Sequence, residues 1–426
     1  MMERYKKSLA YLDRALKVTP GGAQTMSKMA ARFSQGAYPV ALTKGHGATV
    51  TDVDGNEYMD FICGLACMTL GYGHGGVEDA VQRQLAQGVS FSLPHYREAD
   101  LAERLCDLIP CAEMVRFVKT GSEATEAAIR TARRATGRDL ILTVGDGYHG
   151  WHSWFQSVKP YHPGIPEAYT TLIQSFPYGD ILALEEKLEQ HGNTAAIIME
   201  PCLHQVVDLL YLQQVRALCT KHKIILIWDE MVTGFRWANG GAQQYFNVMP
   251  DLACFGKACA NGFPLAFLCG RRDLMTYADL VSGTFGGEAL SIAACHAVLN
   301  AYATEDVIKT LWALGDQFAT GVDQAILISG LPAKRLGYAV KPLIQFTEEP
   351  ILCMTKFIEI LATLGILWHP GGSNISAAMS RQDIDMAIAA VHVAMATVKD
   401  CLATKEWNLK GQPIQAALTV RAEVKA

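Results

Sequence analysis

The segment that decides the fold is Ile224-Ile225-Leu226-Ile227-Trp228-Asp229-Glu230, an unbroken apolar run that ends in two carboxylates. A second run, Pro250-Asp251-Leu252-Ala253-Cys254-Phe255-Gly256-Lys257, places Lys257 28 positions after Asp229. Strands that are buried on both faces of a sheet read as continuous apolar runs. We therefore predict two buried strands, each followed closely by an ionisable side chain.

Similar apolar runs alternate with longer helical patterns over much of the chain. The runs cover residues 114–117, 140–144, 195–199, 224–228, 252–255 and 265–269. This alternation predicts an α/β fold with a mainly parallel central sheet and right-handed crossover helices. In such sheets the ligand site lies at the carboxyl ends of the strands.

Polar and small residues follow these runs, where a ligand site is expected. They are Thr120, Gly121 and Ser122 after the first run, Tyr148 and His149 after the second, Glu200 after the third, Asp229 after the fourth and Lys257 after the fifth. An amine and a carboxylate on neighbouring strand ends are what a pyridoxal 5'-phosphate (PLP) enzyme needs, because lysine binds the aldehyde and aspartate pairs with the ring nitrogen. The pattern predicts PLP as the cofactor.

Each of these residues also has a purely structural interpretation. The Thr120-Gly121-Ser122 segment begins a helix, where exposed N–H groups favour a phosphate but equally serve an ordinary N-cap. Tyr148 could stack on a cofactor ring or close the rim of the core. Asp229 could belong to a structural salt bridge, and Lys257 could be a surface lysine, although its apolar surroundings argue against that.

The composition is that of a globular protein with one large and one smaller domain. The chain has 426 residues, of which 50% are hydrophobic and 19% charged. We expect residues 61–310 to form the large domain, with residues 1–60 and 311–405 forming a smaller α+β domain from both chain ends. A hairpin is predicted with its tip at residues 52–56, where Asp-Gly favours a tight turn. Residues 406–426 are expected to be a loosely held tail.

Charge and cysteine usage exclude several classes of protein. The formal net charge of −5 provides no basic surface for nucleic acid or an anionic membrane. We find no apolar run of the length that a membrane span needs and no signal peptide, so a cytoplasmic protein is expected. The twelve cysteines are scattered, which favours reduced thiols over disulfides or zinc. His149 and His152 lack nearby carboxylate or thiol partners, so no metal site is expected.

With these residues in place, the chain resembles the class III (ω-type) PLP-dependent aminotransferases of fold type I, the aspartate aminotransferase-like fold. Within them it is similar to the glutamate-1-semialdehyde 2,1-aminomutase branch, from Pro20 to about residue 400. The motifs that carry the resemblance are Pro20-Gly21-Gly22, the segments 52–60 and 116–124, Tyr148-His149-Gly150, Glu200-Pro201, Asp229-Glu230 with Gly234-Phe235-Arg236, Pro250-Asp251-Leu252 with Gly256-Lys257, and Gly283-Thr284-Phe285-Gly286-Gly287.

The resemblance implies a role for each matched residue. Lys257 becomes the Schiff-base lysine and Asp229 the partner of the ring nitrogen. Further cofactor contacts are implied for Thr120, Gly121, Ser122, Tyr148, His149, Glu200 and Met231, the last standing where the family usually has a branched aliphatic residue. Thr284 resembles the residue that reaches the phosphate of the partner subunit's cofactor, which implies a homodimer.

The chain departs from the aminomutase pattern where that enzyme selects its substrate. Lys28 replaces an arginine that binds carboxylate, and lysine cannot form the same bidentate fork. Leu65 replaces a tryptophan, and Ile375 falls near the place of a glutamate. Thr25 and His204, with the loop at residues 151–166, are further candidate substrate contacts, although loop packing explains each of them equally well. These departures argue against glutamate-1-semialdehyde as substrate.

We therefore expect an aminotransferase that moves an amino group between a small donor amine or amino acid and a keto or aldehyde acceptor. A 2,1-aminomutase would use the same residues while retaining its intermediate, and a decarboxylase or racemase is a third outcome. From a different class, a catalytically silent PLP-binding scaffold stays open, although Lys257, Asp229 and Tyr148 argue against it. The donor and acceptor are not identified by the sequence.

Overall fold

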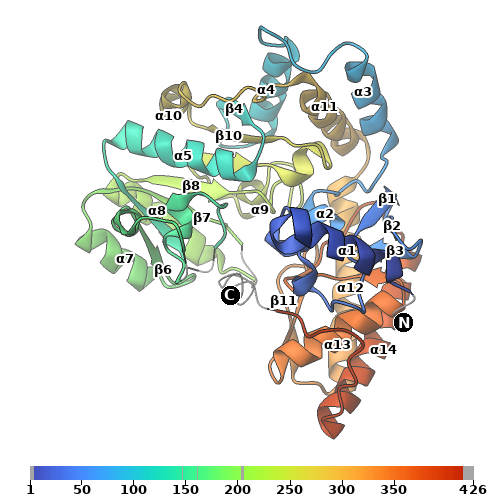
Figure 1. Ribbon diagram of the computed structural model, residues 1–426. Helices are drawn as coiled ribbons and strands as arrows, with labels where there is room; N and C mark the ends of the chain where they lie inside the picture. The colour runs from blue at the N-terminus through green and yellow to red at the C-terminus, as the bar shows by residue number, and fades with distance from the viewer. Residues whose placement is uncertain (1–3, 146, 161, 203–205, 416–426) are drawn as a thin grey trace. The chain divides into compact units, whose positions relative to one another are not determined.

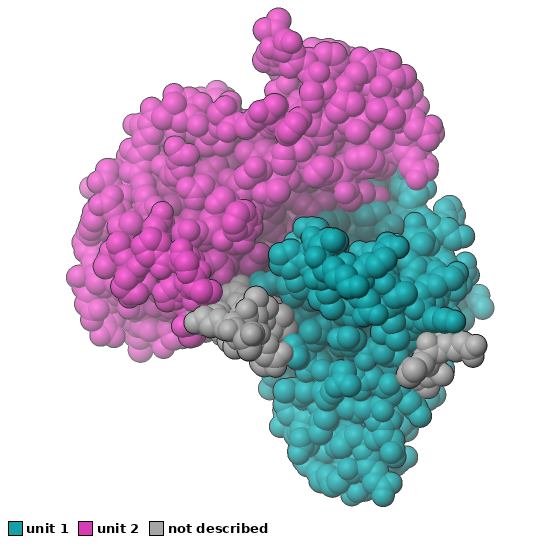
Figure 2. Space-filling view, in the orientation of Figure 1, with its two compact units in different colours: residues 1–74, 309–426 teal, residues 75–308 magenta. Residues whose placement is uncertain are grey.

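The computed structural model describes residues 4–145, 147–160, 162–202 and 206–415, and the chain divides into two compact units (Figures 1 and 2). Unit 1 comprises Met1–His74 and Lys309–Ala426, and unit 2 comprises Gly75–Ile308. The divisions therefore lie after residues 74 and 308, whereas the sequence analysis placed them after residues 60 and 310. Each unit has its own sheet and core.

Among the described residues, unit 2 contains a seven-stranded sheet in the order β4-β10-β9-β8-β7-β5-β6. The strands are β4 (Met114–Val118), β5 (Leu140–Val144), β6 (Ile173–Phe176), β7 (Thr194–Met199), β8 (Ile225–Asp229), β9 (Leu252–Phe255) and β10 (Ala266–Gly270). All residues of β5, β7, β8, β9 and β10 are buried, which explains their continuous apolar sequences.

The predicted α/β fold with a mainly parallel sheet is confirmed, with two differences. Neighbouring strands from β9 through β8, β7 and β5 to β6 are parallel, but β10 pairs antiparallel with both β9 and β4. Strand β6 was not predicted, because its sequence Ile-Gln-Ser-Phe is short and half polar. Such an edge strand lacks the continuous apolar signal of the central ones.

Helices cover the sheet of unit 2, and several of them, such as α5 and α10, begin just after a strand. They are α3 (Gly75–Leu85), α4 (Arg97–Leu108), α5 (Gly121–Thr136), α6 (Ser153–Gln156), α7 (Ile181–Gln190), α8 (Leu209–His222), α9 (Ala242–Phe246), α10 (Arg272–Met275) and α11 (Ala289–Thr304), with short 3₁₀ turns η4 (Glu167–Thr171), η5 (Lys257–Ala260) and η6 (Thr276–Ala278). Helix α5 packs on β7, β9 and β10 (Figure 1). It buries Ala124, Ala127, Ala128 and Ile129 in the core of unit 2.

Unit 1 is built from both ends of the chain. Its elements are α1 (Lys6–Val18), η1 (Pro20–Gly22), η2 (Met26–Lys28), η3 (Ala30–Arg32), β1 (Leu42–His46), β2 (Thr49–Asp52), β3 (Glu57–Asp60), α2 (Cys63–Ala66), most of α12 (Val307–Ser329), β11 (Ala333–Leu336), β12 (Leu343–Phe346), α13 (Pro350–Thr363), β13 (Ile366–Leu367) and α14 (Arg381–Thr404). The predicted hairpin is confirmed, since β2 and β3 pair antiparallel and Gly55 has a φ of 93°.

Two features near the carboxyl end differ from expectation. Helix α14 is long and apolar enough to cross a membrane by length and composition alone, a test that buried helices of globular proteins also pass. It packs on α13 and buries Ile384, Val391 and Met395. Residues 408–415, expected to be loosely held, instead form hydrogen bonds with α13 and with residues 31–35.

Candidate active site

The ionisable residues of unit 2 lie in a row because of the strand order. Asp229 ends β8 and Lys257 follows β9, while Glu200 follows β7 and His149 comes after β5. These four strands are parallel and adjacent, so their carboxyl ends meet at one edge of the sheet. The fold therefore brings together a set of residues separated by more than a hundred positions in sequence.

Asp229 and His149 form a buried pair at this edge. The Nδ1 atom of His149 lies 2.7 Å from Oδ2 of Asp229, and the two residues are only 1% and 3% exposed. The N–H of Met231 donates to the other oxygen of Asp229 at 3.1 Å. The sequence analysis named His149 among the cofactor contacts, with Tyr148 against the ring, and the structure adds its contact with the carboxylate of Asp229. The Nε2 atom of His149 is buried and has no hydrogen-bond partner within the described residues.

Glu200 adds a second buried carboxyl group. Its Oε2 atom accepts the N–H of Tyr148 at 3.1 Å. Burial, followed by the charge of Asp229, raises the pKa of Glu200, and the opposing effects of His149 and Lys257 are smaller. Two acids, an imidazole and an amine thus share one electrostatic environment, which is the kind of cluster that marks a functional site.

Lys257 begins η5 with an unusual backbone. Its φ of 48° lies in the left-handed region, which non-glycine residues adopt at a cost of about 1 kcal/mol or more. The side chain is partly buried, and its amine makes no hydrogen bond or ion pair with the part of the chain that is described. An amine held in a strained position without a partner suits covalent attachment to an aldehyde.

The N-terminus of α5 offers an anion site on the same unit. Thr120 and Glu123 form a capping box, in which Glu123 accepts the N–H of Thr120 and Thr120 accepts the N–H of Glu123. The N–H groups of Gly121 and Ser122 take no part in the box and donate to no described residue. Free N–H groups at the positive end of a 16-residue helix fit a phosphate group.

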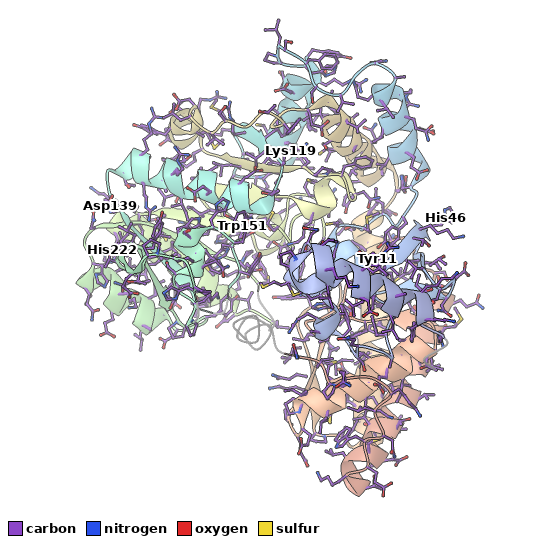
Figure 3. The ribbon with its side chains drawn as sticks, in the orientation of Figure 1. Tyr11, His46, Lys119, Asp139, Trp151 and His222 are labelled. Carbon is purple, nitrogen blue, oxygen red and sulfur yellow. The ribbon has the colours of Figure 1, made fainter. Side chains whose placement is uncertain are left out.

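The loop after β5 closes against this helix start. The N–H of Trp151 donates to the hydroxyl of Ser122 at 3.2 Å, and a Cβ added at Gly150 would lie 2.4 Å from that same oxygen. Trp151 and Lys119, the latter just after β4, are both labelled in Figure 3. The ring of Tyr148 is 56% exposed and packs edge-on against Phe155. An exposed ring beside buried acids is placed to cover a flat ligand.

Met231 lies close to both the start of α5 and the glycine that precedes Lys257. A Cβ at Gly121 would lie 2.9 Å from the sulfur of Met231, and one at Gly256 would lie 2.7 Å from it. Met231 therefore packs against both the helix start and the residue before Lys257, and a side chain at either glycine would displace the thioether. Thr284 lies instead in an exposed loop, in a recess of about 220 Å³ that Lys119, Glu123 and His152 also line.

The predicted substrate residues belong to unit 1, except His204, which lies outside the described residues. Lys28 and Leu65 line one pocket of about 300 Å³ there, together with Phe33, Tyr38 and Leu367. Thr25 is exposed and is not part of that lining. Ile375 is fully buried, and its N–H donates to Val340. We no longer expect Ile375 to contact substrate, because its side chain is enclosed by the core of unit 1.

The pocket also contains a strained turn that the sequence did not reveal. In α2 the backbone is left-handed at Cys63, Gly64, Leu65 and Ala66, with φ between 50° and 72°. Asp60 holds this turn: it accepts the N–H of Ile62 and the hydroxyl of Tyr72. Burial raises the pKa of Asp60, and these hydrogen bonds oppose that effect. In the sequence, Gly64 is the one residue of this turn whose type favours a left-handed backbone, so the pattern did not predict the turn.

Comparisons with known proteins identify the family of the chain. Residues 30–373 match the model of the family Aminotransferase class-III. The chain is 37% identical over 362 residues to 3-aminobutyryl-CoA aminotransferase of Cloacimonas acidaminovorans, covering 82% of this chain and 86% of that protein. It is 32% identical over 436 residues to glutamate-1-semialdehyde 2,1-aminomutase of Syntrophobacter fumaroxidans, covering 94% and 100%.

Solved structures with the same fold include PLP-bound proteins. The PLP-bound FumI protein of Sphingopyxis sp. MTA144 superposes with a TM-score of 0.89 at 27% identity, covering 96% of this chain and 99% of that one. The free helix-start N–H groups, the buried carboxylate of Asp229 and the unpaired amine of Lys257 are groups that could hold the phosphate, ring nitrogen and aldehyde of PLP. The chain belongs to the class III aminotransferases, a family of PLP-dependent enzymes of fold type I.

Proposed function

We propose that this aminotransferase uses Lys257 as its Schiff-base residue and Asp229 as the partner of the ring nitrogen. The observation that carries the proposal is the unpaired Lys257 amine at the strand end next to the one that holds the Asp229–His149 pair. Bound PLP supplies an aldehyde that captures primary amines and a ring that withdraws electrons from the bond being broken. In this proposal the protein supplies the group that transfers the proton, Lys257, and the negative charge that faces the ring nitrogen, Asp229.

Each neighbouring residue has a distinct task in this proposal. With PLP bound, the Nζ atom of Lys257 would take the proton from the substrate carbon that carries the amine and would deliver it to the cofactor carbon. Asp229 keeps a proton on the ring nitrogen, and His149 holds the Asp229 carboxylate in place through the 2.7 Å contact. Gly121 and Ser122 bind the phosphate.

The remaining cofactor residues enclose the ring. Tyr148 would cover one face of a bound ring and Met231 the other, which suits methionine because its flexible thioether adapts to a flat surface. Glu200 fixes the loop that carries Tyr148 through its bond to the Tyr148 N–H. The raised pKa of Glu200 limits the negative charge near Asp229.

We propose that the substrate enters with a small apolar body and one anionic end. Support comes from the pocket of unit 1, where Phe33, Tyr38 and Leu65 provide apolar surface and Lys28 provides a positive charge. The Lys28 amine has no ion-pair partner among the described residues. A lysine offers a point charge rather than a bidentate fork, so the anion need not be a rigidly oriented α-carboxylate.

The related 3-aminobutyryl-CoA aminotransferase acts, by its name, on an amine at the β carbon of an acyl chain. We propose that β-amino compounds are donors here as well. Glutamate-1-semialdehyde is disfavoured because Lys28 and Leu65 replace the polar and aromatic groups of the aminomutase pattern. The aminomutase reaction is the alternative, since relatives with that name match the chain over most of its length.

A half-reaction screen with the PLP-loaded protein tests this proposal. The donors are 3-aminobutyrate, β-alanine, glutamate, alanine and 1-phenylethylamine. Each is followed by loss of the visible absorbance of the bound cofactor and by its recovery with pyruvate or 2-oxoglutarate. We expect 3-aminobutyrate to react fastest. Conversion of glutamate-1-semialdehyde without a second substrate would favour the aminomutase instead, and an absorbance that no donor changes would favour a silent scaffold.

We further propose a cytoplasmic homodimer in which Thr284 of one protomer contacts the cofactor phosphate of its partner. Support comes from the exposed loop around Thr284, where Leu280 and Phe285 also present large apolar side chains to solvent. Ten of the twelve cysteines are buried, and scattered buried thiols suit a reducing compartment. Light scattering gives the mass in solution, and Thr284→Ala should weaken PLP retention without dissociating the dimer.

A further inference from the structure

The segment 408–415, which we call the C-terminal strap, follows α14 and runs along unit 1. Lys356 on α13 donates to the carbonyl of Asn408 at 3.1 Å. Further along, the N–H of Ile414 donates to the hydroxyl of Thr355 at 3.1 Å. Both ends of the strap are therefore fastened to the same helix.

A buried carboxylate holds the middle of the strap. Glu359, also on α13, is 3% exposed and accepts the N–H groups of Lys410 at 3.0 Å and Gly411 at 2.8 Å. The hydroxyl of Ser34 donates to the same carboxylate at 2.6 Å. A buried carboxylate is stable only when such donors satisfy it, so the strap and Ser34 are tied to one charged group.

The strap also pairs with the segment that forms part of the pocket. The N–H of Gln412 donates to Gln35 at 2.9 Å, and the N–H of Gln415 donates to Ala31 at 2.8 Å. The guanidinium of Arg32 donates to the carbonyl of Gln415. We call residues 27–35 the wall segment, because Ser27, Lys28, Ala30 and Phe33 line the 300 Å³ pocket.

The wall segment has little regular structure of its own. Two 3₁₀ turns, η2 and η3, provide its local order, and each is three residues long. Short 3₁₀ turns are weak by themselves, so position must come from outside contacts. His369 supplies one such contact, through Nε2 and the carbonyl of Ser27 at 3.2 Å. Phe33 stacks on Tyr38 with ring centroids 4.7 Å apart, and the strap adds its hydrogen bonds with residues 31–35.

We propose that the C-terminal strap and Glu359 position the wall segment, so that they set substrate affinity without touching substrate or cofactor. The inference rests on the proposed function only in treating this pocket as the substrate pocket. Glu359 is thus a positioning residue, linked through the strap and Ser34 to the place where Lys28 presents its charge.

Gly411 provides the sharpest test. A Cβ at this position would lie 2.5 Å from Oγ of Ser34, 2.6 Å from the carbonyl oxygen of Gln35 and 2.9 Å from the nitrogen of Ala37. Two of these atoms are backbone and cannot turn away. Gly411→Ala should therefore lift the strap from the wall segment. Matched controls are Gly192→Ala, where a Cβ meets nothing within 4 Å, and Gln412→Ala, whose exposed side chain is not used.

The experiment uses the full-length holoenzyme with 3-aminobutyrate as donor. For Gly411→Ala we expect KM to rise about 10-fold while kcat stays within about two-fold. Hydrogen exchange at residues 27–35 should speed up by about 10-fold or more, while exchange at residues 252–260 and the cofactor absorbance stay unchanged. Glu359→Gln, which keeps the size but removes the charge, should give a smaller change in the same direction.

Three results would overturn the inference. Unchanged exchange at residues 27–35 in Gly411→Ala would mean that the strap does not hold the wall segment. Faster exchange with an unchanged KM would mean that the position of the wall does not set affinity. Loss of cofactor absorbance would mean that the strap supports the fold as a whole. If the unmodified enzyme reacts with no donor, the proposed function fails, while the exchange measurement still tests the strap.

Discussion

The edge of the sheet in unit 2 and the pocket of unit 1 are built in opposite ways. The edge consists of residues that directly follow buried strands, so the apolar core that fixes β8 and β9 also fixes Asp229 and Lys257. The pocket is lined by residues of 3₁₀ turns and loops together with Leu42, Asp60 and Leu367 from short strands, and α13, His369 and the C-terminal strap form hydrogen bonds with its wall segment. Under the proposed function, the groups that carry out the chemistry stand on rigid strand ends, whereas the residues proposed to select the substrate stand on a wall that can change without disturbing a sheet core.

The largest expected effect is at Lys257. Lys257→Ala removes the amine that holds the aldehyde and moves the proton, and kcat should fall by about 10⁴-fold. Borohydride reduction of the holoenzyme followed by peptide mass mapping should find the adduct on Lys257. Lys334→Ala, on the exposed face of β11, is the matched control and should keep full activity. Substantial turnover by Lys257→Ala would contradict the proposed mechanism.

Asp229→Asn should produce the next largest loss. The amide keeps the shape but cannot stabilise a positive ring nitrogen, so kcat should fall by about 10²–10³-fold. The cofactor should still bind, because the Schiff base and phosphate contacts stay intact. Absorbance measures occupancy and steady-state kinetics measure turnover, with Asp13→Asn on the exposed face of α1 as control. Equal kcat in Asp229→Asn and the unmodified enzyme would assign Asp229 a structural role.

His369 should make unit 1 sensitive to acid. Burial, followed by the charge of Arg32, lowers the pKa of His369 from 6.5 to about 4. Its Nδ1 atom accepts the N–H of Gly371, and only the neutral ring has a nitrogen that can accept this hydrogen bond. Between pH 4 and pH 6.5 the unfolded chain therefore binds more protons at His369 than the folded chain does. The stability that the neutral His369 contributes is complete above pH 6.5 and is lost as the pH falls toward about 4.

Between pH 7 and pH 5 this loss should reach about 2 kcal/mol in the free energy of unfolding. Denaturant unfolding at both pH values measures it. His369→Asn removes the titrating group, so its stability should change less between the two pH values than that of the unmodified protein. The same pH dependence in both proteins would place the acid sensitivity elsewhere.

Lys28 should have the smallest effect, confined to binding. Lys28→Ala should raise KM about 10-fold for 3-aminobutyrate, with kcat nearly unchanged, because one exposed charge contributes modestly to holding an anion. The neutral donor 1-phenylethylamine serves as the internal control and should keep its KM. An equal change for both donors would show that Lys28 acts on the pocket's shape and not through charge.

Sequence reasoning was most successful where local pattern and structure coincide. The buried strands, the hairpin at Gly55 and the helix start at Gly121 each follow from a few adjacent residues. It was less successful where contacts join distant segments. The pairing of His149 with Asp229 and the burial of Ile375 depend on which strands and loops become neighbours. Strand β6 and the antiparallel β10 required the sheet itself.

The sequence alone determined the family, the cofactor and the order of polar residues behind apolar strands, because strand burial imprints a continuous apolar pattern on neighbouring residues. Only the tertiary structure decided how Glu359, Ser34 and Gly411 come together, and that Lys28 and Leu65 share a pocket. Glu359 and Ser34 are 325 positions apart, so no local pattern records their contact. Such contacts arise from the packing of whole elements, which brings distant residues within hydrogen-bonding range.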